Sequence, residues 1–238
     1  LEKIEASEGR SFYYIRPEFE DQIFLQQGGL FIAGGYPRLG DTGGHLFLTL
    51  GEFGLQVGDI KPDFTGTSGA FETGGFSSGV FVSGPYAYVA DRELGLVVVD
   101  VSNTISHEHP MPTQEVGRLV KPDVDWGAEG VFIAARGGNT YAYVAAGDAG
   151  LRIVDVTDPT RLTPDKEVGF LLTPAPARAV FVSGNYTYVA AGDLLVVNVS
   201  DPTKPEMRGR YDVPGQAIGV QVAGKLAYVV DKTGRLLM

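Results

Sequence analysis

The sequence contains no cysteine among its 238 residues. Disulfide bonds, thiolate metal sites and cysteine nucleophiles are therefore excluded together. A chain of this length buries enough apolar surface to fold without disulfides, so the missing cysteine does not distinguish an oxidising compartment from a reducing one.

Basic residues and long apolar runs are also scarce. Lys and Arg number 19 against 29 Asp and Glu, which gives a net charge of -10, and the cations form no run. Binding to nucleic acid or to an anionic membrane requires clustered cations, so we expect neither partner. No stretch of about 18 apolar residues occurs, because prolines and a charge interrupt the best candidate, VGFLLTPAPARAVFV from Val168. We therefore expect no membrane span in this chain.

Glycine and the β-branched and aromatic residues are abundant instead. The chain has 33 Gly and 14 Pro, together about a fifth of its length, and 44% hydrophobic residues. The glycines and prolines follow no three-residue period and separate short runs rich in Val and Tyr. This pattern predicts a folded protein with many strands and many turns.

Four stretches of the sequence align with one another. They begin at Gly79, Gly130, Ala179 and Gly219, at intervals of 51, 49 and 40 residues. Such intervals are typical of propeller blades or of helical repeats. Helices are not expected, because Val, Ile and Tyr dominate and no apolar period of 3.6 residues persists.

Each unit reads as four strands joined by tight turns. In the first unit VFVSG, YAYVA and LVVVDV follow one another, and in its siblings a DPT turn leads to a weaker segment such as KEVGFLL. The third segment, LVVV at residues 96–99, is apolar without alternation, so it must be covered on both faces. Only Arg152 interrupts the equivalent LRIV run, and the pattern does not explain it. A propeller covers both faces of each four-stranded blade with its neighbours, and we therefore predict an all-β propeller.

The first 78 residues are less regular. LFIAGG from Leu30 and HLFLTL from His45 predict two strands of a diverged blade, SFYYI from Ser11 an added outer strand, and residues 63–78 a glycine-rich connection. We count about five blades in a single domain spanning 1–238, with repeat units at 79–129, 130–178, 179–218 and 219–238. The last unit lacks its outer half. We expect the chain to form part of a longer propeller of about six to eight blades, the alternative being an N-terminal strand that completes the last blade.

The motif AYVAD-x-x-x-GL-x-x-VDVS-DP-x-x-P, present in residues 87–102, 142–160 and 188–205, resembles the LVIVD repeat. The resemblance covers about two thirds of the chain from Gly79 onward. It implies a β-propeller of a bacterial or archaeal extracytoplasmic protein, associated with the cell surface. It implies no particular biochemical activity, since one fold hosts unrelated functions.

Two groups of residues could bind a metal. Asp148, Asp155 and Asp158 lie close together in the sequence, but aligned Asp and Asn residues of the other units favour a role in turns over an EF-hand loop. His107 and His109 form the only histidine cluster, and with His45 as a third ligand they are a candidate metal site. The alternative is that this segment is a solvent-facing connection.

The mouth of the central channel is the candidate ligand site. Ser78, Glu129, Arg178 and Ile218 stand two residues before successive innermost strands, and Trp126 lies just upstream of Glu129. Ser78, Trp126, Glu129 and Arg178 could therefore contact a ligand, with Trp126 stacking on it. The alternative is an ion pair between Glu129 and Arg178, with Trp126 as an anchor for its loop.

No G-x-S-x-G elbow and no G-x-G-x-x-G opening a helix occur in the sequence. We therefore predict no catalytic residue and no cofactor. The leading hypothesis is a non-enzymatic scaffold or protein interaction domain that works outside the cytoplasm, with other proteins as partners in a larger surface or redox assembly. The alternatives are a hydrolase or lactonase-like enzyme, or a carbohydrate or peptide binder, that uses the channel mouth.

Overall fold

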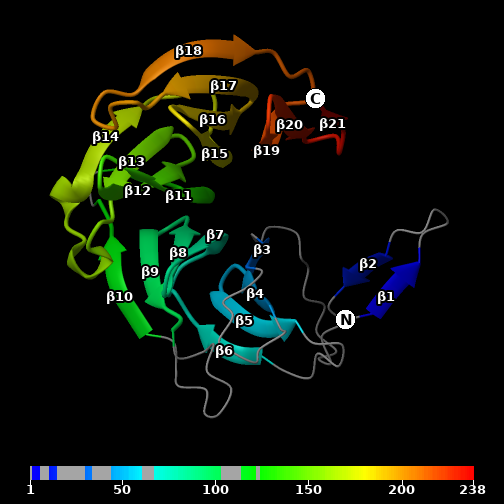
Figure 1. The fold of residues 1–238 in the computed structure, drawn as a ribbon, viewed down its shortest axis with the longest axis vertical. Helices are drawn as coiled ribbons and strands as arrows, with labels where there is room; N and C mark the ends of the chain where they lie inside the picture. The colour runs from blue at the N-terminus through cyan, green and yellow to red at the C-terminus, as the bar shows by residue number, and fades with distance from the viewer. Residues whose placement is uncertain are drawn as a thin grey trace.

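The strand-forming residues build five antiparallel sheets that follow one another along a curved row in the computed structural model (Figure 1). The structure describes residues 2–5, 11–14, 30–33, 44–60, 67–102, 114–121 and 124–238. Four of the sheets have four strands and the fifth has three. Each sheet is one propeller blade, which confirms the prediction of an all-β propeller with about five blades.

The blades are numbered 1 to 5 in chain order. Blade 1 contains β3 (Leu30–Ala33), β4 (Gly44–Thr49), β5 (Leu55–Ile60) and β6 (Thr67–Phe71); blade 2 contains β7 (Ser77–Ser83), β8 (Tyr86–Asp91), β9 (Gly95–Asp100) and β10 (Gln114–Leu119); blade 3 contains β11 (Gly130–Arg136), β12 (Asn139–Ala145), β13 (Leu151–Asp155) and β14 (Glu167–Leu171); blade 4 contains β15 (Ala179–Ser183), β16 (Tyr186–Ala191), β17 (Asp193–Asn198) and β18 (Glu206–Tyr211); and blade 5 contains β19 (Ala217–Ala223), β20 (Leu226–Asp231) and β21 (Leu236–Leu237). Two short 3-10 helices, η1 (Pro159–Arg161) and η2 (Pro164–Lys166), connect β13 to β14.

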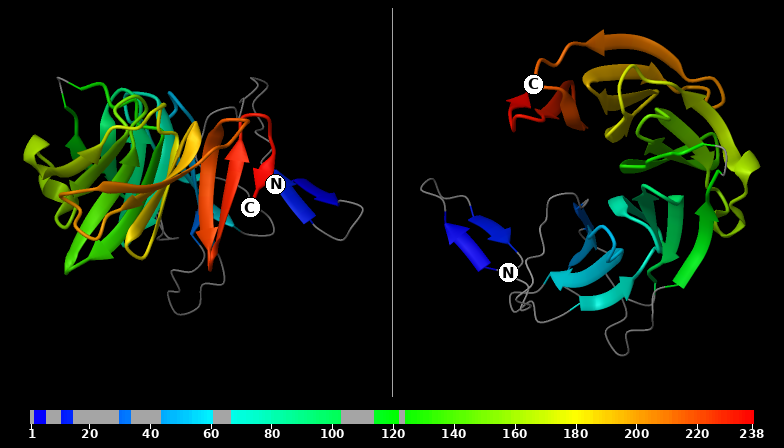
Figure 2. Two further views of the ribbon diagram at one scale, coloured as in Figure 1. Left: turned by 90° about the horizontal axis from the view of Figure 1, so that it is seen from above. Right: turned by 180° about the vertical axis from the view of Figure 1, so that it is seen from behind.

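Within each blade every strand pairs with the next strand in the chain, so each blade is a simple meander. The first strand of each blade lies on the inner side of the curved row, and the fourth strands β10, β14 and β18 lie on the outer side (Figures 1 and 2). The strand order matches the prediction for the four-stranded blades, but the connection from the third to the fourth strand is longer than a tight turn, as between β13 and β14, where η1 and η2 lie. The segments that precede the innermost strands therefore meet at one end of the blades.

Blade 1 corrects the interpretation of the N-terminal third. Residues 67–71, which we expected in a glycine-rich connection, form the outer strand β6, and β5 adds a third strand that the pattern did not reveal. Leu55 and Val57 of β5 are fully buried. Burial of these two side chains, rather than a regular sequence pattern, makes this segment a strand.

The strand β2 (Ser11–Tyr14) was expected to add an outer strand to a blade. It pairs instead with β1 (Glu2–Glu5) in a two-stranded sheet of its own. Glu5 lies opposite Ser11, which makes the pair a hairpin. The predicted outer strand was therefore wrong for this segment.

The hydrophobic core is divided into layers between neighbouring blades. One cluster joins blades 1 and 2, a second joins blades 2 and 3, a third joins blades 3 and 4, and a smaller one joins blades 4 and 5. In each layer one blade presents its forward face, defined here as the face toward the next blade in the chain. Each blade is thus stabilised mainly by its neighbours.

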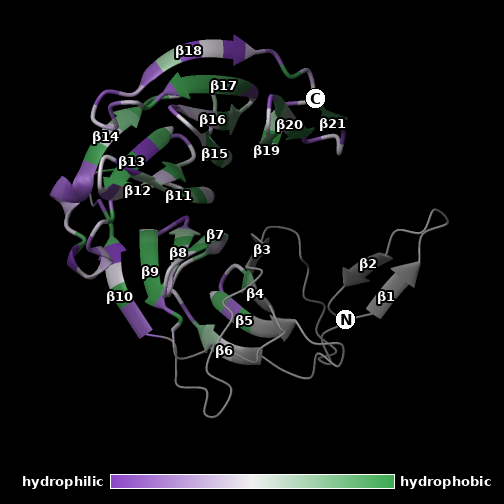
Figure 3. Cartoon of the chain, viewed as in Figure 1, coloured by the Kyte–Doolittle hydropathy of each residue, from purple (hydrophilic) through white to green (hydrophobic). Residues whose placement is uncertain are grey.

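The third strands are the most deeply buried elements, as their unbroken apolar sequence predicts. Residues 96–99 of β9 are all 0% exposed. In Figure 3 the apolar colour covers β9 and β17, and polar residues mark the outer strands β10 and β18. Each fully buried Val or Leu contributes about 1.5–3 kcal/mol relative to an exposed one. Tyr88 and Tyr143 of the second strands belong to the layers between blades, which confirms blade packing for these two members of the tyrosine pairs, whereas Tyr186 of the third pair is 42% exposed.

A backbone contact joins the outer edges of blades 2, 3 and 4. A Cβ atom added to Gly117 of β10 would lie 2.0 Å from the carbonyl oxygen of Pro159, and one added to Gly169 of β14 would lie 2.1 Å from that of Pro202. Both prolines belong to the Asp-Pro-Thr turn of the following blade. Only glycine lets the turn approach this closely.

The equivalent glycine of blade 4 offers a matched comparison. We expect Gly169→Ala to lower the free energy of unfolding by about 1–3 kcal/mol, because the turn must move away from β14. In Gly209→Ala the new methyl group would meet only the Val196 side chain, at 3.7 Å, so we expect no measurable loss. Chemical denaturation of both variants tests this difference, and equal destabilisation of the two would contradict it.

Candidate functional site

The predicted mouth residues lie at or before the starts of the innermost strands, and Trp126 among them lines the pocket described below. Glu129 and Arg178 precede β11 and β15, and Arg178 Nη1 donates to both carboxylate oxygens of Glu129, at 3.0 and 2.9 Å. Arg92 Nη2 lies 3.9 Å from the same carboxylate and its guanidinium lies over the ring of Phe76. One acid thus connects blades 2, 3 and 4, and the ion pair named as the alternative to ligand binding is present.

Ser78 and Trp126 are both withdrawn from solvent. Ser78 is 7% exposed, and its carbonyl accepts a hydrogen bond from Thr49 Oγ1 of blade 1 at 3.0 Å. Trp126 is 3% exposed and belongs to the layer between blades 2 and 3. Its ring anchors the segment before β11, as the second of the two interpretations proposed. A ligand role for these residues stays a prediction.

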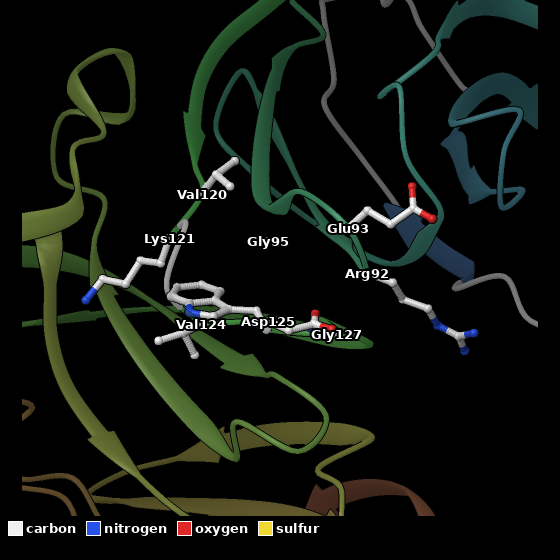
Figure 4. A pocket seen from close by; sticks show the side chains of 9 residues that line it. Arg92, Glu93, Gly95, Val120, Lys121, Val124, Asp125 and Gly127 are labelled. Carbon is white, nitrogen blue, oxygen red and sulfur yellow. The ribbon is translucent and has the colours of Figure 1, made fainter.

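A pocket of about 620 Å³ lies beside this mouth, between the β8–β9 hairpin and the segment that leads into β11. Its wall combines two cations, two acids and apolar surface, supplied by Arg92, Glu93, Gly95, Val120, Lys121, Val124, Asp125, Trp126 and Gly127. Arg92 and Glu93 extend from one side of the pocket and Lys121 from the other (Figure 4). The mixture of charges suits a small polar ligand more than an apolar one.

The pocket lies at a junction that differs from the other three. In blades 1, 3 and 4 a main-chain bridge joins the hairpin between the second and third strands to the next blade. The bridged pairs are Gly51 with Ser77, Gly147 with Ala177 and Gly192 with Ala217. The three glycines have positive φ, which the bridge requires. Arg92 holds this place in blade 2, and its N–H donates to Phe76 O of its own blade at 3.0 Å. In the described part of the chain no such bridge joins blades 2 and 3, and the pocket opens there.

Sequence reasoning missed the pocket residues Arg92 and Lys121. A signal was available for Arg92, because it replaces a glycine that the hairpins of blades 1, 3 and 4 share. Lys121 had no comparable signal. Its side chain contacts Glu167 of the next blade, and that partner lies far along the sequence.

Glu167 explains the arginine that interrupts the third strand of blade 3. Its side chain is 3% exposed and pairs with Arg152 Nη1 at 2.8 Å, in addition to Lys121 Nζ. Arg152 also donates from Nε to Ala149 O at 2.9 Å and lies over the ring of Phe170. A buried carboxylate with two cations is well compensated, so the charge in the strand is tolerated.

The three acids considered for calcium lie on separate elements. Asp155 accepts hydrogen bonds from the backbone and hydroxyl of Thr157, and Asp158 does the same with Thr160. The hydrogen bond from Thr160 lowers the pKa of Asp158. These contacts confirm the turn role of Asp155 and Asp158, and Asp148 is exposed in the β12–β13 hairpin.

Burial and hydrogen bonding also shift the pKa of groups within the blades. Hydrogen bonds from Thr233 and Arg235 lower the pKa of Asp231, in the last hairpin, to about 2. Desolvation raises the pKa of Tyr88 to about 12 and also raises that of Tyr143. Asp231 is therefore ionised and the two tyrosines neutral at physiological pH.

His107 and His109 lie outside the described residues. Within the described ranges no group of three or more His, Asp or Glu side chains could hold a metal ion. Nor does any helix among them have the length and apolar character needed to cross a membrane.

The repeat motif decides the family. The LVIVD repeat family matches residues 74–107, 133–167, 175–213 and 214–238, more than half of the chain. This chain belongs to the LVIVD repeat family. Comparison of the sequence with curated proteins found no match. The LVIVD blades are also similar to known structures, at identities that show the fold alone.

The computationally designed Ika8 protein shares 10% identity at a TM-score of 0.59, over 84% of this chain and 55% of that one. A functionally unknown protein from Desulfotomaculum acetoxidans shares 12% identity at a TM-score of 0.56. The match covers 81% of this chain and 64% of that one. The computationally designed Ika4 protein shares 11% identity at a TM-score of 0.54. The match covers 73% of this chain and 97% of that one. This LVIVD chain thus spans about half the length of Ika8.

The buried ion pair between Arg152 and Glu167 gives a stability test. We expect Arg152→Met to lower the free energy of unfolding by about 3 kcal/mol, because it leaves Glu167 buried with one cation fewer. The control is Arg208→Met, which breaks an exposed pair with Glu206 on β18 and should change stability by less than about 0.5 kcal/mol. Urea denaturation measures both, and a small loss for Arg152→Met would show that the buried pair contributes little.

Proposed function

We propose that this LVIVD chain is a non-enzymatic interaction domain and that it docks another protein on the forward face of blade 5. The proposal includes a place outside the cytoplasm, in a larger assembly at the cell surface. The exposed forward face of this blade carries the proposal.

Equivalent positions in the other blades show how unusual this face is. Leu96, Leu151 and Leu194 open the third strands of blades 2, 3 and 4 and are 0%, 0% and 7% exposed, whereas Leu236 in the same register is 60% exposed. The alanines paired with these leucines are 0% exposed, whereas Val230, which pairs with Leu236, is 39% exposed. Positions that form a core layer in blades 2, 3 and 4 are therefore open to solvent in blade 5.

The surroundings of the face suit a protein partner. Leu226 at the start of β20 is also exposed, and Lys225, Lys232 and Arg235 lie around the apolar residues in sequence and are exposed. An apolar centre with a charged border is typical of protein interfaces, and contiguous exposed apolar surface marks interaction sites.

The pocket beside Arg92 and Trp126 favours a second candidate, the binding of a small polar ligand. This candidate includes the hydrolase or lactonase-like and carbohydrate or peptide-binding alternatives. It uses the junction of blades 2 and 3, so changes to blade 5 should leave it intact. The two candidates can therefore be separated by substitution.

The docking proposal predicts that Leu236→Asp abolishes complex formation, because a carboxylate would be desolvated at the centre of the interface. Leu172→Asp is the matched control, since Leu172 is 63% exposed but lies after β14 of blade 3. Native mass measurement and pull-down from the source material report the complex. The proposal fails if the unaltered protein is found only as a free monomer, or if Leu236→Asp binds as well as Leu172→Asp.

A further inference from the structure

The two cations in the wall of the pocket between blades 2 and 3 are both engaged by acids outside that wall. Lys121 Nζ pairs with the buried carboxylate of Glu167, and in Figure 4 the lysine side chain extends away from the other labelled residues. Arg92 Nη2 lies 3.9 Å from Glu129, and its guanidinium lies over the ring of Phe76. The pocket therefore offers little uncompensated positive charge to an anionic ligand.

The two acids in the same wall have no such partners. Glu93 and Asp125 are exposed, and in the described part of the chain neither carboxylate forms an ion pair with Lys or Arg. Asp125 Oδ1 accepts one backbone hydrogen bond, from Gly127 N at 3.1 Å. The uncompensated charge of the wall is thus negative, and the chain as a whole carries a net charge of -10. Both charges favour a cationic ligand.

The rest of the wall is aromatic and aliphatic. Trp126, Val120 and Val124 line the pocket beside the acids. A Cβ atom added to Gly95 would lie 3.4 Å from Trp126 Cε3, so the indole packs directly against the β8–β9 hairpin and is held in place by it. An indole ring attracts a cation, and the two valines suit an alkyl chain. Carboxylates, an aromatic ring and aliphatic side chains together recognise an organic cation.

The hairpin of blade 3 shows why the pocket belongs to one junction. Asp148 holds the position of Glu93 in the β12–β13 hairpin and is also exposed. There, however, Gly147 forms a main-chain bridge with Ala177 of the next blade. Where Arg92 replaces that glycine, the bridge is missing and the cavity of about 620 Å³ has room for a small molecule or one long side chain.

We propose that this pocket binds an alkyl ammonium ion, with Glu93 and Asp125 facing the charged nitrogen and Trp126, Val120 and Val124 in contact with the carbon chain. The inference rests on the second candidate function and names the chemistry of its ligand. The ion is either a free polyamine or the side chain of a lysine in a peptide. A divalent metal ion fits less well, because the described residues contain no group of three or more acidic or histidine ligands.

The fluorescence of Trp126 tests the proposal directly. Trp126 is the single tryptophan of the chain, so its emission reports on the pocket itself. Spermidine and the peptide acetyl-Gly-Lys-Gly-amide represent the two sources of the ion. At least one of them should give a saturable change, and the tighter of the two identifies the source. n-Pentanol, an uncharged chain, should bind about tenfold more weakly or less, because it lacks the ammonium group.

Two variants that remove a charge without changing shape locate the ion. Glu93→Gln and Asp125→Asn should each weaken amine binding about tenfold, because each removes one carboxylate from the ammonium group. Asn keeps the oxygen that accepts from Gly127 N. Asp148→Asn is the matched control, since it makes the same change in the hairpin of blade 3, and it should bind as the unaltered protein does. Thermal unfolding verifies that each variant is folded.

The outcomes separate this inference from the functions proposed above. Amine binding that Glu93→Gln or Asp125→Asn weakens, and Asp148→Asn does not, supports it. The inference is overturned if neither amine binds saturably, if n-pentanol binds as tightly as the amines, or if all three variants bind alike. In those cases a saturable change with an uncharged sugar such as glucose would still support the second candidate function. Loss of the protein complex in Leu236→Asp would still support the docking proposal.

Discussion

The need to cover both faces of every blade is the constraint on which this structure depends. The third strands are apolar without alternation, so a blade alone would expose one apolar face on each side. The layers between blades satisfy this need for blades 2, 3 and 4. The layers on the forward faces of these three blades each contain a tyrosine from the second strand and aliphatic residues from the third. Stability is therefore shared between neighbours, and the forward face of blade 5 is where the sharing stops in the described chain.

The same constraint shows why so much of the fold could be predicted. The units that begin at Gly79, Gly130 and Ala179 place equivalent positions in the same buried environment. The same residue types therefore recur at these positions, and the strands can be predicted from them. Blade 1 could be predicted only in part, because its β6 has little apolar sequence and is recognised by its pairing with β5. The glycines of the fourth strands also escaped notice, although alignment of these strands places Gly117, Gly169 and Gly209 together. Their meaning depends on a turn from another blade, which no local pattern shows.

The candidate site could likewise be predicted only where its residues hold equivalent positions in the repeat. Glu129 and Arg178 could be predicted as a pair, because they precede the innermost strands of adjacent blades. Trp126 is buried in the layer between blades 2 and 3, which the sequence did not indicate. The pocket lies at the junction where Arg92 stands in place of the glycine of the other hairpins, and this difference is recognised only once the main-chain bridges are known. Long-range partners such as Glu167 with Arg152 and Lys121 are beyond a sequence pattern for the same reason.

The central claim is that a blade owes its stability to the neighbours on its two faces, and that blade 5 presents an uncovered forward face. Hydrogen exchange, resolved by strand, measures this most directly because protection reports local opening. The account predicts slow exchange in β12, β13, β16 and β17, which lie in covered blades, and clearly faster exchange in β20 and β21. Equal protection of β20 and β16 in the isolated protein would contradict it.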